Sequence, residues 1–187
     1  AMIHYNKADP SKRIMPGELV LVDTGGFYKG GYATDLTRTW IAGGSPVIPW
    51  MNPIYLQNKR NIYTLVLSGA LNGLNAELPP GVGGAYLDDL VTKPIVKAGY
   101  EIKHGTGHGI GIDLHESPPD ISGGADSIYA LREGNVFSIE PGVYLDGWGG
   151  VRIENLVTVV KHPDPYKAQQ GWHKIQCLTF APLDNNL

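Results

Sequence analysis

The 187-residue sequence contains one cysteine, Cys177, so the chain cannot form an internal disulfide. Such a chain suits a reducing compartment or a fold that needs no covalent cross-link, and we expect Cys177 to fill a buried packing position. No apolar run approaches the roughly 18 residues that a membrane-spanning helix needs. The first ten residues, AMIHYNKADP, lack the apolar core of a signal peptide. These absences favour a cytoplasmic protein without a membrane partner.

An excess of either charge is also absent. The sequence has 15 Lys and Arg against 18 Asp and Glu, which gives a net charge of -3. Proteins that bind a phosphate backbone usually carry a basic stripe, so we expect no nucleic-acid partner. The length and the apolar fraction of 42% predict one globular domain over residues 1–187.

Glycine is abundant, with 25 copies, and many of them flank residues that could bind a metal. Glycine permits backbone conformations and close approaches that other residues cannot adopt. Segments in which glycine adjoins acids or histidines are therefore candidate site segments. The clusters are Gly25, Gly26, Gly30 and Gly31; Gly105, Gly107, Gly109 and Gly111; and Gly147, Gly149 and Gly150.

Two apolar runs near the N-terminus predict an antiparallel hairpin. Glu18–Asp23 follows a Pro-Gly turn signal and is rich in valine and leucine, whereas Tyr32–Ile41 alternates threonine with apolar or aromatic residues. The glycines between the runs suit the connection. We expect Asp23 and Asp35 to face each other across the two strands.

The middle of the chain predicts two helices. Ile54–Ala76 has apolar residues at steps of three and four, and Tyr86–Ala98 has a shorter pattern that Pro94 should interrupt and Gly99 should end. A surface loop is expected over Lys161–Gly171. Further strands are expected around His104–Ile112, Asn135–Glu140, Gly150–Val160 and Lys174–Phe180. Strands, two helices and strands again indicate an α+β domain.

Three of the six histidines crowd into one segment, HGTGHGIGIDLHE, as His104, His108 and His115. A single histidine is usually a surface residue or a satisfied core residue, but the cluster favours a site. Residues four apart in an extended strand share a face, so His104 and His108 could point into one cavity. His115 is expected to follow a bend.

Four acids lie in predominantly apolar segments, which is unusual for carboxylates. They are Asp23 in LVLVDTG, Asp35 in YATDLTRT, Glu140 in FSIEPGVY and Glu154 in VRIENLVTVV. Removing water from a carboxylate costs several kcal/mol unless a partner compensates, and a metal ion is one such partner. For any one acid the alternative is a turn cap or an ion pair with Arg38 or Arg152.

Four carboxylates and one imidazole would form a hard, oxygen-rich site. Such a site suits Mn²⁺, Mg²⁺, Fe²⁺ or Co²⁺ better than a thiolate-bound structural zinc. Two ions bridged by carboxylates would balance the four negative charges. The sequence therefore predicts a dinuclear centre.

The chain resembles the pita-bread metallopeptidases in four segments, VDTGGFYKGGYATDLTRTW, HGTGHGIGIDLHESP, FSIEPGVY and GVRIENLVTV. Aminopeptidase P is the branch that it resembles most, and the matching set extends from His4 nearly to the C-terminus. The resemblance implies a curved antiparallel sheet with helices on its outer face. It also implies that Asp23 chelates one ion, that Asp35 and Glu154 bridge both, and that His108 and Glu140 hold the other.

The same resemblance implies further roles. Glu140, His115, His4 and Arg152 would be catalytic, with Glu140 moving a proton, and His104, His115 and Tyr144 would bind substrate. Thr37 and Thr39 could orient ligands, and Tyr5 and Trp148 could add to the substrate wall. The cofactor would be two divalent ions, with Mn²⁺ the first choice and Co²⁺, Fe²⁺ and Zn²⁺ the alternatives. The substrate would be a peptide with proline in second position, and the full-length protein would be a homodimer.

The resemblance also implies that residues 1–187 form a partial catalytic domain, because the family has helices before the position of His4 and a helix after LTFAPLDNN. A proline dipeptidase of the same fold shares the five ligands and is the nearest alternative. A non-catalytic pita-bread domain that binds peptides or proteins is another, but such relatives commonly lack metal ligands. Creatinase-type hydrolysis without metals is disfavoured for the same reason.

Overall fold

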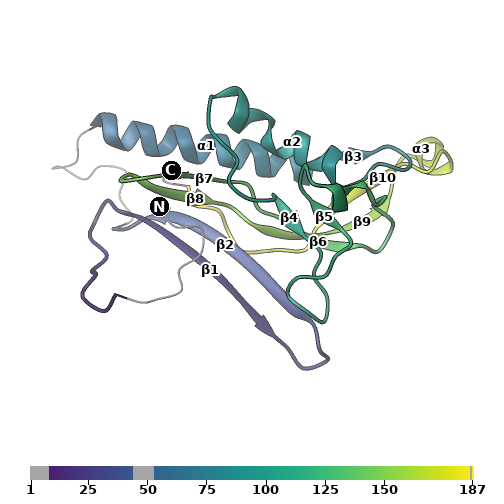
Figure 1. Ribbon diagram of the computed structural model, residues 1–187, viewed down its shortest axis with the longest axis horizontal. Coiled ribbons are helices and arrows are strands. Elements are labelled where there is room, and N and C mark those ends of the chain that lie inside the picture. The colour runs from purple at the N-terminus through teal and green to yellow at the C-terminus, as the bar shows by residue number, and fades with distance from the viewer. Residues whose placement is uncertain (1–8, 44–52, 186) are drawn as a thin grey trace.

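The structure is a computed structural model, of which residues 9–43, 53–185 and 187 are described (Figure 1). Its helices are α1 (Pro53–Leu74), α2 (Gly84–Lys97), the 3-10 helix η1 (Ala125–Ile128) and α3 (Pro165–Gln169). Its strands are β1 (Leu19–Phe27), β2 (Ala33–Ile41), β3 (Glu77–Leu78), β4 (Gly107–His108), β5 (Asp120–Ile121), β6 (Val136–Ile139), β7 (Gly142–Leu145), β8 (Gly149–Arg152), β9 (Asn155–Lys161) and β10 (His173–Cys177). None of the helices within these ranges is long and apolar enough to cross a membrane.

All strand pairs are antiparallel, so the chain combines helices with antiparallel sheets as the sequence predicts. The largest sheet has the order β3-β10-β9-β6, and β1-β2, β4-β5 and β7-β8 are separate pairs. In Figure 1, α1 and α2 lie along one side of the strands from β6 to β10, and the β1–β2 hairpin lies away from the helices. The described residues thus form four regular sheets, and the isolated bridge between Gly109 and Phe137 connects the β4–β5 pair to the largest of them.

The interruption between two of these sheets has an identifiable cause. β6 pairs with β9, and β7 pairs with β8, as if in one long hairpin. Glu140 and Pro141 separate β6 from β7, and Ile153 and Glu154 separate β8 from β9. Proline has no backbone N–H to donate, so the ladder cannot continue regularly there. Both glutamates therefore lie where the chain leaves the ladder.

The N-terminal hairpin forms as expected, but its register differs from our expectation. Asp23 pairs with Thr37, and Asp35 pairs with Gly25. The prediction that Asp23 and Asp35 face each other directly is therefore wrong. They lie two positions apart along the ladder, and because side chains alternate between faces, both still point to the same side.

Helices α1 and α2 lie close to their predicted positions, but Pro94 does not interrupt α2. Its missing N–H leaves the carbonyl of Leu90 without its usual partner four residues on. Asn72 on α1 donates to that carbonyl oxygen at 3.1 Å, so the neighbouring helix supplies the lost hydrogen bond. Gly99 has a positive φ of 85°, which suits the predicted end of the helix.

Several short elements differ from the sequence prediction. The strand expected around residues 104–112 is reduced to β4, the one expected over 150–160 is split into β8 and β9, and β3, β5 and β7 were not anticipated. The loop expected over Lys161–Gly171 contains α3, whose first turn is capped by the carboxylate of Asp164. Cys177 is exposed, so the expectation that it is buried is wrong.

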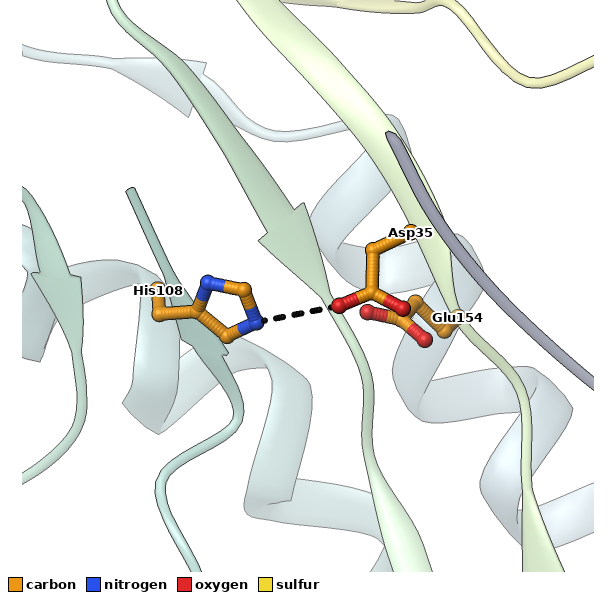
Figure 2. A group of neighbouring side chains, drawn as sticks. All are labelled: Asp35, His108 and Glu154. Atoms are coloured by element: carbon orange, nitrogen blue, oxygen red, sulfur yellow. Dashed lines mark ion pairs between the residues drawn. The ribbon is translucent and has the colours of Figure 1, made fainter. Parts of the chain in front are cut away.

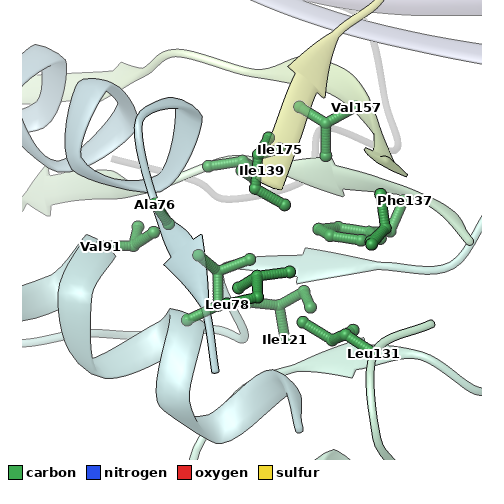
Figure 3. Close-up of a cluster of buried hydrophobic side chains, with 11 residues drawn as sticks. Ala76, Leu78, Val91, Ile121, Leu131, Phe137, Ile139, Val157 and Ile175 are labelled. Carbon is green, nitrogen blue, oxygen red and sulfur yellow. The ribbon is translucent and has the colours of Figure 1, made fainter. Parts of the chain in front are cut away.

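Two apolar clusters hold the strands that carry the site. One joins α2 to the four-stranded sheet (Figure 3), through residues that include Val91, Phe137, Ile139 and Val157. The other packs α1 against β7 and β8. Burial of each large apolar side chain contributes about 1.5–3 kcal/mol. β6, which ends just before Glu140, and β8, which ends at Arg152, are thus both held by clusters of buried apolar side chains.

Candidate metal centre

A cavity of about 610 Å³ brings the predicted site residues together. The β1–β2 hairpin and the segment from His104 to Ser122 contribute most of its wall. The wall includes all five predicted metal ligands and three more of the predicted site residues: Asp23, Asp35, His104, His108, His115, Glu140, Arg152 and Glu154. Residues distant in sequence therefore converge on one space. His4 and Tyr5 lie outside the described residues.

Three of the predicted ligands form a compact group. Asp35, His108 and Glu154 each offer one donor atom, and these atoms all lie within 4.8 Å of one another (Figure 2). Nε2 of His108 is 3.5 Å from Oδ2 of Asp35 and 3.4 Å from Oε1 of Glu140. Asp35 comes from β2 and His108 from β4. Glu140 comes from the short segment between β6 and β7, and Glu154 from the one between β8 and β9. Four of the five predicted ligands therefore lie together, because Glu140 contacts His108 of the compact group.

A backbone contact fixes the orientation of the His108 ring. Nδ1 lies 3.0 Å from the carbonyl oxygen of Gly109, and since a carbonyl only accepts hydrogen bonds, Nδ1 carries the hydrogen in this contact. When Nε2 has no proton, its lone pair therefore points into the space between the carboxylates. This is the tautomer that a histidine metal ligand commonly adopts.

Glu154 is buried almost completely, with 1% of its surface exposed. Oε2 accepts a hydrogen bond from the hydroxyl of Thr37 at 2.7 Å, whereas Oε1 has no hydrogen-bond partner among the described residues. Burial and the nearby carboxylates of Glu140 and Asp35 raise the pKa of Glu154 to about 8. A cation would stabilise the ionised carboxylate and occupy the unpaired oxygen.

The pKa values of Glu140 and His108 are raised as well. Burial raises the pKa of Glu140 above its usual range. Burial alone would lower the pKa of His108, but its contact with Asp35 and the nearby carboxylates outweigh this effect and raise the pKa to about 9. The donor set of carboxylates and one imidazole fits hard divalent ions, so the residues present suit the metal centre that the sequence predicts.

Arg152 organises the other side of the cavity. Its buried guanidinium donates to the carboxylate of Asp23, to the hydroxyl of Tyr144 at 2.7 Å and to the hydroxyl of Thr37 at 3.2 Å. The backbone N–H of Arg152 donates to the hydroxyl of Thr39 at 3.1 Å. Both threonines that the sequence offers as orienting residues thus contact groups of the site.

Tyr144 is 2% exposed and does not line the cavity itself. Nδ1 of His104 donates to the carbonyl oxygen of Gly105 at 2.7 Å, so Nε2 of the neutral ring accepts a hydrogen bond from the Tyr144 hydroxyl at 2.8 Å. Burial raises the pKa of Tyr144 to about 12. Arg152, Tyr144 and His104 therefore form a chain of hydrogen bonds that ends at the cavity wall.

His115 lies beside the predicted histidine ligand, with its ring centroid 4.2 Å from that of His108.

Sequence reasoning did not single out Ser138, which is fully buried beside two predicted ligands. Its hydroxyl accepts the backbone N–H of His108 at 3.0 Å and lies 3.1 Å from Oε1 of Glu140. Its position two residues before Glu140 on a strand, and hence on the same face, is the signal that could have revealed it. Asp120, which pairs with His108 in the β4–β5 ladder and lines the cavity, was also missed.

Gly107 lets two ligand-bearing segments come close together. A Cβ atom at this position would lie 2.0 Å from the carbonyl oxygen of Ser138, which is closer than any real contact. β4 therefore approaches β6 through bare backbone. The glycines around His108 in the sequence thus have a structural reason.

Comparisons with known proteins agree with this geometry. The sequence profile of metallopeptidase family M24 matches residues 1–161. The chain is 36% identical over 195 residues to a probable Xaa-Pro aminopeptidase P of Talaromyces marneffei. The aligned region covers 100% of this chain and 28% of that protein. The chain thus spans less than a third of the length of this curated relative.

Two solved structures are similar over most of the chain. One is the X-prolyl aminopeptidase of Caenorhabditis elegans, described as a cytosolic enzyme with a di-nuclear active site. It is 32% identical with a TM-score of 0.81, and the match covers 96% of this chain and 28% of that one. The other is the prolidase of Pyrococcus furiosus, which is 34% identical with a TM-score of 0.73, covering 91% of this chain and 44% of that one.

Proposed function

The chain belongs to metallopeptidase family M24, and we infer that the protein carrying it is a metal-dependent Xaa-Pro aminopeptidase. This enzyme would hydrolyse the peptide bond between an N-terminal residue and a following proline. The observation that carries the proposal is the convergence of Asp35, His108 and Glu154, with Oε1 of Glu154 buried and unpaired. The names of the relatives support the substrate class.

The proposed cofactor is a pair of divalent ions, with Mn²⁺ the first choice. Its ligands would be Asp23, Asp35, His108, Glu140 and Glu154, all on the cavity wall. Bound divalent ions would lower the pKa of the attacking water and polarise the scissile carbonyl. The di-nuclear site of the worm enzyme supports a pair of ions over a single one.

The side chains of the cavity would then orient the substrate and move protons. Glu140, whose pKa is raised by burial, is suited to accept a proton from the attacking water and pass it to the leaving amine. Arg152 and Tyr144 would hold His104 in place, and His104 and His115 would bind the peptide. His4 is proposed as a further catalytic residue from the sequence resemblance.

The assembly and the location are also proposals. We propose that the full-length protein is a homodimer and acts in the cytoplasm. The cytosolic description of the worm enzyme supports this location.

A proline dipeptidase is the second candidate, because the archaeal prolidase is as similar in sequence as the aminopeptidase. The test is a panel of Ala-Pro, Ala-Pro-Ala and longer peptides with the full-length protein, together with metal analysis. Cleavage of the tripeptide and longer peptides is expected, with Ala-Ala-Ala as the control for proline. Cleavage of the dipeptide alone would favour a prolidase. A protein without metal or cleavage would instead favour a binding module.

A further inference from the structure

Thr106 joins three segments of the fold through its polar groups. Its hydroxyl donates to Oδ1 of Asp88 at 2.5 Å, and its backbone N–H donates to the carbonyl oxygen of Ile121 at 2.7 Å. Its own carbonyl oxygen accepts the backbone N–H of Glu140 at 2.8 Å. Because Thr106 is fully buried, water does not compete for these contacts. Helix α2, strand β5 and the segment after β6 therefore meet at one residue.

Asp88 supplies the contact from helix α2. Burial raises the pKa of Asp88, whereas the hydrogen bond from Thr106 lowers it, so the hydroxyl favours the charged form of the carboxylate. Half-burial of a carboxylate on a helix is unfavourable unless a partner compensates. The Thr106 hydroxyl supplies such a partner.

Thr106 connects Asp88 to two predicted metal ligands. His108 lies two residues further along the same segment, and Glu140 lies just beyond the end of β6, where its backbone N–H donates to the carbonyl oxygen of Thr106. Nε2 of His108 and Oε1 of Glu140 are 3.4 Å apart. A shift of Thr106 would therefore change the gap between these two groups.

We propose that Asp88 is a positioning residue of the metal centre and that, through Thr106, it holds Glu140 at its distance from His108. The proposal rests on the metal ligands of the proposed function. It does not depend on which peptide the protein cleaves.

The experiment uses the full-length protein with Asp88→Ala, Thr106→Val and the double variant. Asp89→Ala is the matched control, because Asp89 is the exposed neighbour on the same helix. Asp88→Asn retains an acceptor oxygen, and Thr106→Ser retains the hydroxyl and serves if the valine variant does not fold. Calorimetry measures the affinity for Mn²⁺. Hydrogen exchange of the metal-free protein measures the opening of the Glu140 amide.

Each single substitution is expected to weaken Mn²⁺ binding by about 10–100-fold and to accelerate exchange of the Glu140 amide. The double variant should be no worse than the worse single variant, because both remove one contact. Asp89→Ala should match the parent, and Asp88→Asn and Thr106→Ser should lie close to it.

Unchanged exchange at Glu140 in Asp88→Ala would overturn the proposal, and so would additive effects in the double variant. Equal acceleration at Glu140 and at Val157, in the core strand β9, would show general loosening and would also overturn it. If the parent protein binds no Mn²⁺, the proposed function fails, but the exchange data still decide the role of Asp88.

Discussion

The hydroxyl of Ser138 fixes one oxygen of Glu140. Ser138 accepts the backbone N–H of His108, so its own hydrogen is available for Oε1 of Glu140, 3.1 Å away. One small side chain therefore ties a predicted histidine ligand to a predicted carboxylate ligand.

Ser138→Ala is expected to weaken Mn²⁺ binding by about 10-fold, because it leaves the N–H of His108 without its acceptor and frees the Glu140 carboxylate to rotate. Calorimetric titration of the full-length protein measures the change. Ser68→Ala is the control, because Ser68 donates only to the carbonyl of Thr64 within α1. Equal affinities for Ser138→Ala and the parent would contradict this role.

Glu140→Gln is expected to lose turnover by about 100-fold or more and to retain some metal. The amide keeps an oxygen donor but cannot accept a proton. Turnover of Ala-Pro-Ala and metal content should be measured on the same preparation. Near-normal turnover with metal bound would exclude the proton-transfer role of Glu140.

The stability of the metal-free protein is expected to fall as the pH rises from about 5 to about 9. Glu154 has a pKa of about 8 in the folded protein against an ordinary value of 4.5, and His108 has about 9 against 6.5. In this window the folded state binds more protons than the unfolded chain, so raising the pH favours unfolding for both groups.

The affinity for Mn²⁺ should instead increase as the pH rises, because the ligands must lose their protons before they can bind the ion. Thermal unfolding with and without Mn²⁺ tests both trends, and the stabilisation by Mn²⁺ should be larger at about pH 8.5 than at about pH 5.5. A metal-free protein that becomes more stable across this range would contradict the charge assignment.

Glu154→Gln is expected to stabilise the metal-free protein by about 1–3 kcal/mol near neutral pH, because the Glu154 carboxyl beside Asp35 and Glu140 must take up a proton on folding, whereas the amide is neutral in both states. The same variant should lose most of the stabilisation that Mn²⁺ gives, which is about 2.7 kcal/mol when the ion is at 100 times its Kd. Urea unfolding of the variant, the parent and the exposed control Glu101→Gln measures both effects. A less stable variant that Mn²⁺ stabilises fully would exclude Glu154 as a ligand.

The sequence predicts the four acids of the candidate site because each lies in a predominantly apolar segment, where a carboxylate is unusual. The β1–β2 hairpin shows the limit, since its strands were found but their register was not. Register depends on which residues pair across the turn, and a two-residue shift keeps Asp23 and Asp35 on one face. The apolar pattern is the same for both registers, so it could not distinguish them.

Contacts between distant segments explain most of the other differences. Pro94 signals a helix break in isolation, but Asn72 on another helix supplies the missing hydrogen bond. β4 and β5 have only two residues each, so neither has an alternation that could be recognised in the sequence. The role of Ser138 likewise depends on a contact across 30 positions of the sequence.

The bare backbone at Gly107 has a consequence for how such a centre can vary. Because β4 meets the carbonyl of Ser138 without an intervening side chain, main-chain contact limits how far His108 lies from Glu140. Core side chains behind these strands could be exchanged one for another while that separation stays nearly constant. The size of ion that the centre accepts would then depend on the path of the backbone, and a change in that size would require substitution of the ligands themselves.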